Sequence, residues 1–316
     1  MPTVTPILIE GAFDDPHAIR ALVEHHGPYP TVSSYLPASA TGESQTEAGL
    51  PATLPWFRAN WAVNGRTAVE GAGAILHNTR FIEAASRLFD SSDVVPTTVV
   101  VNVNTPMPPG AVHVDIPSFH GAHRDTYPLR LLQAMGTSGL FEQWRVVEVG
   151  AVSWFYDGPG GAYDYWPSGL GGPMRSMRPP FANVALVTDN DRMFHRIARV
   201  GDLDAAAPPI SPAALVHRTG ETWTITDLRE PVACYSDEQV RISILWKARI
   251  GATSPTGTDP LTVDRVVDIV ASDLRARGLQ CPRPSSPLSD ESWIDLVHAT
   301  YYRPISVGDR ADEPDL

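Results

Sequence analysis

The middle of the chain is divided into short segments by a high density of turn-forming residues. The 316 residues include 30 prolines and 24 glycines. Proline cannot donate to a helix or sheet ladder and glycine allows left-handed turns, so such a chain favours many short elements over long helices. Between about residue 95 and residue 250, runs rich in Val, Ile, Thr and aromatic residues alternate with these turns. This alternation predicts a β-sandwich or β-barrel.

Helical patterns flank this β-rich region and predict a mainly β protein with helices packed outside. The first expected helix begins after Asp15, which can cap it, and ends at Gly27. Residues 29–55 are rich in Pro, Ser and Thr and indicate a long irregular loop, either functional or merely exposed. The other expected helices lie at residues 78–90, 129–135, 263–277 and 289–302. The expected strands lie at residues 99–104, 111–116, 146–156, 223–228 and 240–248, with a hairpin over residues 183–200.

Composition excludes several classes of function. The chain has 24 basic and 36 acidic residues, a net charge of −12, so it should repel a phosphate backbone and we expect no nucleic-acid partner. No apolar run approaches the ~18 residues that a membrane span needs. The first residues lack a basic, then apolar, leader pattern, and Cys234 and Cys281 fit reduced thiols, so we expect a cytoplasmic protein.

The segment from Gly110 to Asp115 contains the first candidate for chemistry. His113 and Asp115 are two residues apart, so on a strand both side chains point to the same face. An imidazole beside a carboxylate supplies two ligands of the 2-His-1-carboxylate set, which binds Fe(II) and leaves three positions open. His-x-Asp occurs often by chance. A metal site therefore requires a second histidine from a distant part of the chain.

Two histidines could complete the set. His195 lies 82 residues after His113, at the end of the expected hairpin. His217 follows a strand-like run at residues 214–216. We favour His195 because its hairpin context is the stronger one. A second His-x-Asp, His123 and Asp125, lies in a polar segment without strand character, and we expect it in a loop.

A late apolar strand carries an arginine and a serine on one face. Arg241 and Ser243 are two residues apart in the run VRISILWKA. A buried arginine is costly unless an anion pairs with it, and its planar fork matches a carboxylate bidentately. The neighbouring serine hydroxyl adds a further donor.

Taken in order, His-x-Asp, a distal His and Arg-x-Ser on short strands resemble the Fe(II)/2-oxoglutarate-dependent oxygenases. The resemblance implies a double-stranded β-helix, or jelly roll, over residues 95–250. It also implies buttressing N-terminal helices and a loop over residues 1–94. Residues 251–316 would be a helical C-terminal appendage. It assigns His113, Asp115 and His195 to Fe(II), and it assigns Arg241 and Ser243 to the distal carboxylate of 2-oxoglutarate.

The resemblance also bears on the reaction. Related halogenases have a small residue in place of the aspartate, so the presence of Asp115 implies hydroxylation or another oxidation. O2 would be the second co-substrate, with succinate and CO2 as products. The substrate would be a small molecule, an amino acid or a peptidyl side chain. The oligomeric state stays open.

One departure from the family pattern leaves alternatives open. The arginine follows His195 by 46 residues, so either an insertion at about residues 201–235 intervenes or His217 is the distal ligand. Other classes also fit a jelly roll: a cupin-type isomerase, a 2-oxoglutarate-independent dioxygenase, or a non-catalytic binding module. Arg241 and Ser243 favour the oxygenase, because none of the others requires a carboxylate clamp.

Overall fold

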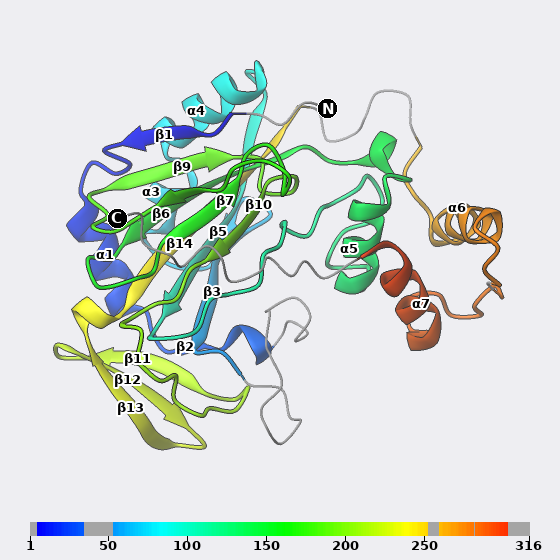
Figure 1. Cartoon of the computed structure of the whole chain (residues 1–316). Coiled ribbons are helices and arrows are strands. Elements are labelled where there is room, and N and C mark those ends of the chain that lie inside the picture. Colours follow the sequence, from blue (N-terminus) through cyan, green and yellow to red (C-terminus); the bar gives the residue numbers. More distant parts are fainter. Residues whose placement is uncertain (1–4, 35–52, 252–258, 281, 303–316) are drawn as a thin grey trace. The chain divides into compact units, whose positions relative to one another are not determined.

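The computed structural model describes residues 5–34, 53–251, 259–280 and 282–302, which belong to two compact units. The first unit combines Met1–Val114 with Val149–Ala248, and the second combines Asp115–Glu148 with Arg249–Leu316. The first unit contains the strands of three sheets, and the second unit contains three α-helices (Figure 1). The expected mainly β protein with a helical C-terminal region is confirmed. The division at residues 94 and 250 into three domains stays a prediction.

The largest sheet has seven strands, and helices cover its outer face. Its order is β1 (Ile7–Glu10), β9 (Val184–Thr188), β6 (Glu148–Phe155), β14 (Arg241–Ile250), β5 (Val94–Asn104), β3 (Trp56–Val63) and β4 (Arg66–Thr67). The helices α1 (Pro16–His25), α3 (Ala72–Leu76) and α4 (Thr79–Phe89) belong to the same unit. Trp246 of β14 donates to the carbonyl of Leu76 at 2.8 Å, and its ring packs against Phe81 of α4 at 5.7 Å. The residues of β14 with even numbers therefore face the helices.

A smaller sheet packs against the other face of the large one. It consists of β10 (Phe194–Ile197), β7 (Tyr163–Trp166) and β8 (Arg175–Met177). One core cluster joins Trp154 of β6 and Leu186 of β9 to Tyr163 and Tyr165 of β7, with Leu245 of β14 packed against it. Two antiparallel sheets therefore enclose one core, which is the arrangement expected of a jelly roll.

Residues 183–200 do not form the expected hairpin. Strand β9 pairs with β1 and β6, whereas β10 pairs with β7 of the smaller sheet. Both edges of the apolar β9 are already occupied, so β10 has no edge on which to fold back. Residues 189–193 form a turn, in which the amide of Met193 donates to the carbonyl of Asp189 at 2.8 Å. This turn carries the chain from one sheet to the other.

Residues 111–116 do not form the expected strand. Their one ladder contact among the described residues is an isolated bridge between His113 and His195. Prolines at positions 106, 108, 109 and 117 surround the segment and remove donors that a longer ladder would need. The prediction that places His113 and Asp115 on a regular strand is therefore wrong, although the segment is extended at His113.

The region expected as an insertion forms a third sheet. Strands β11 (Leu215–Thr219), β12 (Thr222–Asp227) and β13 (Glu230–Ser236) pair in sequence, and β2 (Tyr29–Pro30) completes the sheet (Figure 1). Residues 29–34, expected as the start of a loop, thus contribute a short strand and a 3-10 turn (Val32–Ser34). The rest of that expected loop, residues 35–52, lies outside the described residues.

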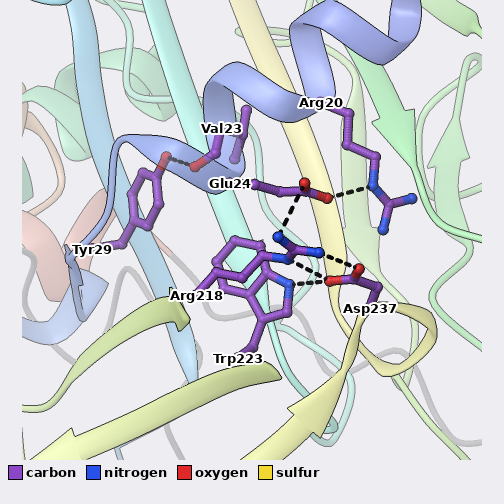
Figure 2. A network of polar contacts seen from close by, with 7 residues as sticks. All are labelled: Arg20, Val23, Glu24, Tyr29, Arg218, Trp223 and Asp237. Carbon is purple, nitrogen blue, oxygen red and sulfur yellow. Dashed lines mark hydrogen bonds and ion pairs between the residues drawn. The ribbon is translucent and has the colours of Figure 1, made fainter. Parts of the chain in front are cut away.

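A partly buried network of charges connects this third sheet to α1 (Figure 2). Arg218 of β11 donates to both oxygens of Asp237, at 2.8 and 2.7 Å. The other side of Arg218 faces Glu24 of α1 at 3.6 Å, and Glu24 accepts from Arg20 at 2.8 Å. The Trp223 indole also donates to Asp237, at 2.9 Å. The inserted sheet is therefore held by paired charges as well as by its strand pairing.

The second unit is built on α5 (Leu129–Ser138), α6 (Val263–Ala276) and α7 (Glu291–Tyr301). Their apolar faces share a core that includes Leu131, Val270 and Trp293. The carboxylate of Asp290 accepts from the amide of Trp293 at 3.1 Å, so Asp290 caps α7. In the described part of the chain no helix has the length and apolarity of a membrane span. Cys234 is an exposed free thiol, and Cys281 and the tail 309–316 lie outside the described residues.

Candidate functional site

The structure brings His113, Asp115 and His195 together. One potential ligand atom from each, two imidazole nitrogens and a carboxylate oxygen, lie within 4.8 Å of one another. The two imidazole rings have their centroids 4.5 Å apart. His195 is supplied by β10, and the bridge between the two histidines holds the 113–115 segment beside it. The predicted His-x-Asp and distal His therefore form one group.

Local hydrogen bonds orient both imidazoles in the same way. The Nδ1 of His113 lies 2.8 Å from the carbonyl of Ala111, and the Nδ1 of His195 lies 2.9 Å from the carbonyl of Met193. A carbonyl only accepts, so in each ring Nδ1 carries the proton. The lone pair of each neutral ring then belongs to Nε2, the atom that can bind a metal. In both cases the carbonyl comes two residues earlier, so the orientation is built into the local chain.

The alternative distal ligand lies elsewhere. His217 belongs to β11 in the third sheet and lines a pocket of about 390 Å³ with Glu24, His25 and Arg218. It does not join the group formed by His113, Asp115 and His195. The second His-x-Asp is on the surface, as expected: His123 and Asp125 are exposed and 3.7 Å apart.

Arg241 is a buried cation at the start of β14. Its side chain is 1% exposed. The Nε atom donates to the carbonyl of Gly161 at 2.7 Å, and Nη1 lies 3.4 Å from the Ser243 hydroxyl. The Nη2 atom is buried and has no hydrogen-bond partner among the described residues. Burial lowers the pKa of Arg241 to about 10, because removing water disfavours the charged form.

The glycine-rich turn after β6 makes room for this guanidinium. Gly161 has a φ of +70°, which favours glycine. A Cβ there would lie 2.7 Å from the Tyr156 ring and 3.1 Å from the Cδ of Arg241. Any larger residue would therefore displace one of these two side chains. The glycine-rich turn at residues 157–161 thus has a specific role beside Arg241.

The aromatic residues between the sheets connect the two parts of the site. The Tyr163 ring lies 5.4 Å from the ring of His195 and 5.4 Å from that of Trp154, and its hydroxyl donates to Asn190 at 3.1 Å. Trp154 and Leu245 belong to the same core, and Leu245 shares a face of β14 with Arg241 and Ser243. The imidazole group and the buried guanidinium therefore adjoin one core. Tyr163 belongs to β7, a four-residue strand that is absent from the strands expected from the sequence.

Comparison with known proteins gives matches to solved structures alone. No family model and no curated protein sequence matches the chain. The chain is similar to an oxidoreductase of the 2OG-Fe(II) oxygenase family from Burkholderia pseudomallei, with 13% identity, a TM-score of 0.42 and coverage of 78% of this chain and 87% of that one. It is also similar to a Pseudomonas putida prolyl-4-hydroxylase, with 12% identity, a TM-score of 0.41 and coverage of 79% and 94%.

A further similar structure is HygX from Streptomyces hygroscopicus, described with nickel, 2-oxoglutarate and hygromycin B bound. Its identity is 10%, its TM-score 0.40, and 83% of this chain and 90% of that chain are covered.

Proposed function

We propose that this chain is an Fe(II)- and 2-oxoglutarate-dependent oxygenase, and specifically a hydroxylase. The observation that carries the proposal is the buried Arg241, whose Nη2 has no partner among the described residues, adjoining the same core as the His113, Asp115 and His195 group. A metal set alone would fit several enzymes. A buried, incompletely paired guanidinium requires an anion as well.

The donor set fits iron. Two neutral imidazoles and one carboxylate supply three protein ligands and leave positions for other ligands, which suits Fe(II) in oxygenases. Because Nδ1 of each ring is bonded to a carbonyl, His113 and His195 would bind the metal through Nε2. Asp115 would supply one carboxylate oxygen. Iron and 2-oxoglutarate, when bound together, supply the oxidising power for O2 chemistry, and the protein supplies the geometry.

The buried cation fits the far end of 2-oxoglutarate. A carboxylate accepts two parallel bonds from a guanidinium, and the Ser243 hydroxyl adds a third donor. The fork of Arg241 is held in place by Gly161, so little ordering remains to be done when the anion binds. Arg241 would thus orient 2-oxoglutarate so that the 2-oxo acid end of this co-substrate reaches the metal.

The reaction would divide O2 between two products. One oxygen atom enters succinate as 2-oxoglutarate loses CO2, and the other is inserted into a C–H bond of the substrate. The carboxylate of Asp115 would bind the metal where related halogenases bind a halide, which supports hydroxylation over halogenation. The substrate would be a small molecule, an amino acid or a peptidyl side chain. The acidic surface, with a net charge of −12, argues against a nucleic acid.

The discriminating experiment is anaerobic addition of Fe(II) and then 2-oxoglutarate to the protein. We expect a visible absorption band that appears only when both are present, and succinate release once O2 and a substrate are admitted. A cupin-type isomerase or a 2-oxoglutarate-independent dioxygenase would bind iron without the 2-oxoglutarate-dependent band. A non-catalytic jelly-roll module would give neither signal. Succinate release across a panel of amino acids, peptides and natural products would then identify the substrate class.

A further inference from the structure

A second buried donor without a partner lies on the strand next to Arg241. The indole Nε1 of Trp154 is buried and has no hydrogen-bond partner among the described residues, and the whole residue is 0% exposed. Buried indole N–H groups usually find an acceptor, because leaving one unpaired is costly. A buried, unpaired N–H close to an incompletely paired guanidinium indicates that both groups bind the same acceptor.

Strand register brings Trp154 beside Ser243. Strands β6 and β14 are neighbours in the large sheet, and the hydroxyl of Ser153 contacts the carbonyl of Ile244 at 3.5 Å. Tyr156, the residue after the end of β6, lies near Arg241, because both side chains lie beside Gly161. Position numbers thus rise along β6 as they fall along β14, which is antiparallel pairing. The next pair after Ser153 and Ile244 is therefore Trp154 and Ser243.

The side chains of this pair point to the inner face of the sheet. Trp154 belongs to the core between the two sheets, stacked on Phe181 at 5.0 Å. Residues two apart on a strand share a face, so Arg241 and Ser243 point the same way as Leu245, which packs on that core. Directly opposite residues on neighbouring strands have their Cβ atoms about 4.5–5.5 Å apart. The indole is therefore within reach of the group that Arg241 and Ser243 would bind.

We propose that Trp154 is a specificity-determining residue, whose indole N–H donates to the distal carboxylate of 2-oxoglutarate beside Arg241 and Ser243. This inference rests on the proposed function. The two oxygens of a carboxylate offer about four acceptor positions, so Arg241, Ser243 and Trp154 can all be accommodated. A donor that is unpaired without the co-substrate and paired with it favours acids that carry a second carboxylate at this distance.

The test compares two buried tryptophans on adjacent strands. Trp154→Phe removes an unpaired N–H, whereas Trp246→Phe removes one that donates to the Leu76 carbonyl on the outer face. With Ni²⁺ in place of iron, we measure the Kd of 2-oxoglutarate by calorimetry and the melting temperature with and without it. A hydrogen bond to a charged group corresponds to about a 10- to 100-fold weaker Kd in Trp154→Phe. Trp246→Phe should keep the wild-type Kd and lose stability without ligand.

A second probe separates the N–H from the packing of the ring. Benzothienylalanine at position 154 keeps the bicyclic shape and replaces N–H by sulfur, so it should weaken 2-oxoglutarate binding as Trp154→Phe does while keeping the ligand-free melting temperature. Equal 2-oxoglutarate affinity in the wild type and in this variant would overturn the inference and leave the proposed function standing. A wild-type protein that binds no 2-oxoglutarate would overturn both.

Discussion

His113 and His195 exchange a pair of backbone hydrogen bonds across 82 residues of sequence. The amide of His113 donates to the carbonyl of His195 at 3.0 Å, and the amide of His195 donates to the carbonyl of His113 at 2.9 Å. This reciprocal pair is one rung of an antiparallel pairing that also includes a bond from the amide of Gly110 to the carbonyl of Ile197 and a bridge between Met107 and Val200. The rung at His113 holds the two histidines side by side. The proposed metal site therefore depends on backbone pairing as well as on the three side chains.

Replacing the His-x-Asp ligands should remove metal binding and leave the fold intact. His113→Ala and Asp115→Ala each delete one of three protein ligands from the group. We expect Mn²⁺ affinity, measured by calorimetry, to fall by more than about 100-fold, since even residues that only orient metal ligands cost 10- to 100-fold. Neither residue belongs to the apolar core, so circular dichroism should be unchanged. Wild-type metal affinity in Asp115→Ala would contradict the assignment.

The choice of distal ligand is tested by a matched pair of histidine variants. His195→Ala should lose metal binding and turnover, because His195 lies with His113 and Asp115. His217→Ala should keep both, because His217 lies on β11 beside α1. The measurements are metal content and succinate release. If His217→Ala were inactive and His195→Ala active, the assignment of the distal ligand would be reversed.

Removing the buried cation Arg241 should weaken the binding of 2-oxoglutarate and leave the affinity for the metal unchanged. Arg241→Ala deletes a bidentate contact to a carboxylate, and hydrogen bonds to charged groups contribute about 1.5–3 kcal/mol. We expect the KM for 2-oxoglutarate to rise by about 10- to 100-fold while Mn²⁺ affinity without 2-oxoglutarate is kept. Arg241→Lys should recover only part of this, since an ammonium cannot reproduce the fork. An unchanged KM with a lower melting temperature would mean that Arg241 is only structural.

The ion pair between β11 and the turn after β13 should stabilise the protein in a pH-dependent way. The Arg218 hydrogen bonds hold the pKa of Asp237 below its ordinary value of 3.8. A depressed pKa means that the stabilisation is complete above about pH 4 to 5 and is lost as pH falls through the lower folded value. Asp237→Asn should therefore lower the free energy of unfolding by about 1–2 kcal/mol at pH 7.

The pH series itself supplies the check on this last prediction. The difference between the wild type and Asp237→Asn, measured by urea unfolding, should be constant from pH 7 to 5 and shrink toward pH 3. Asp268→Asn is the control, because its pair with Arg283 is more than half exposed and should contribute little. A difference that stays constant down to pH 3 would mean that the charge of Asp237 contributes nothing.

Much of the fold was predictable from local patterns. The cap at Asp15, the amphipathic face of residues 263–277 and the β-branched runs depend on neighbours in sequence, so the sequence predicts them. The candidate site was predictable for a related reason. Arg-x-Ser places its two groups on one face of β14 through a spacing of two residues, and the chemistry of His-x-Asp restricts what that pair can bind.

Only the tertiary structure decided which distant segments meet. Residues 183–200 have the pattern of a hairpin, yet the partners of β9 are β1 and β6, and β10 goes to the other sheet. The backbone pairing of His113 with His195 depends on the same choice of partners. So does the position of His217 in a separate sheet. The position of Trp154 beside Ser243 likewise depends on the pairing of β6 with β14, two strands that lie some 90 residues apart in the sequence. A local sequence pattern predicts that a segment forms a strand. It does not predict which other strand pairs with it, because strands throughout the chain compete for the same edges.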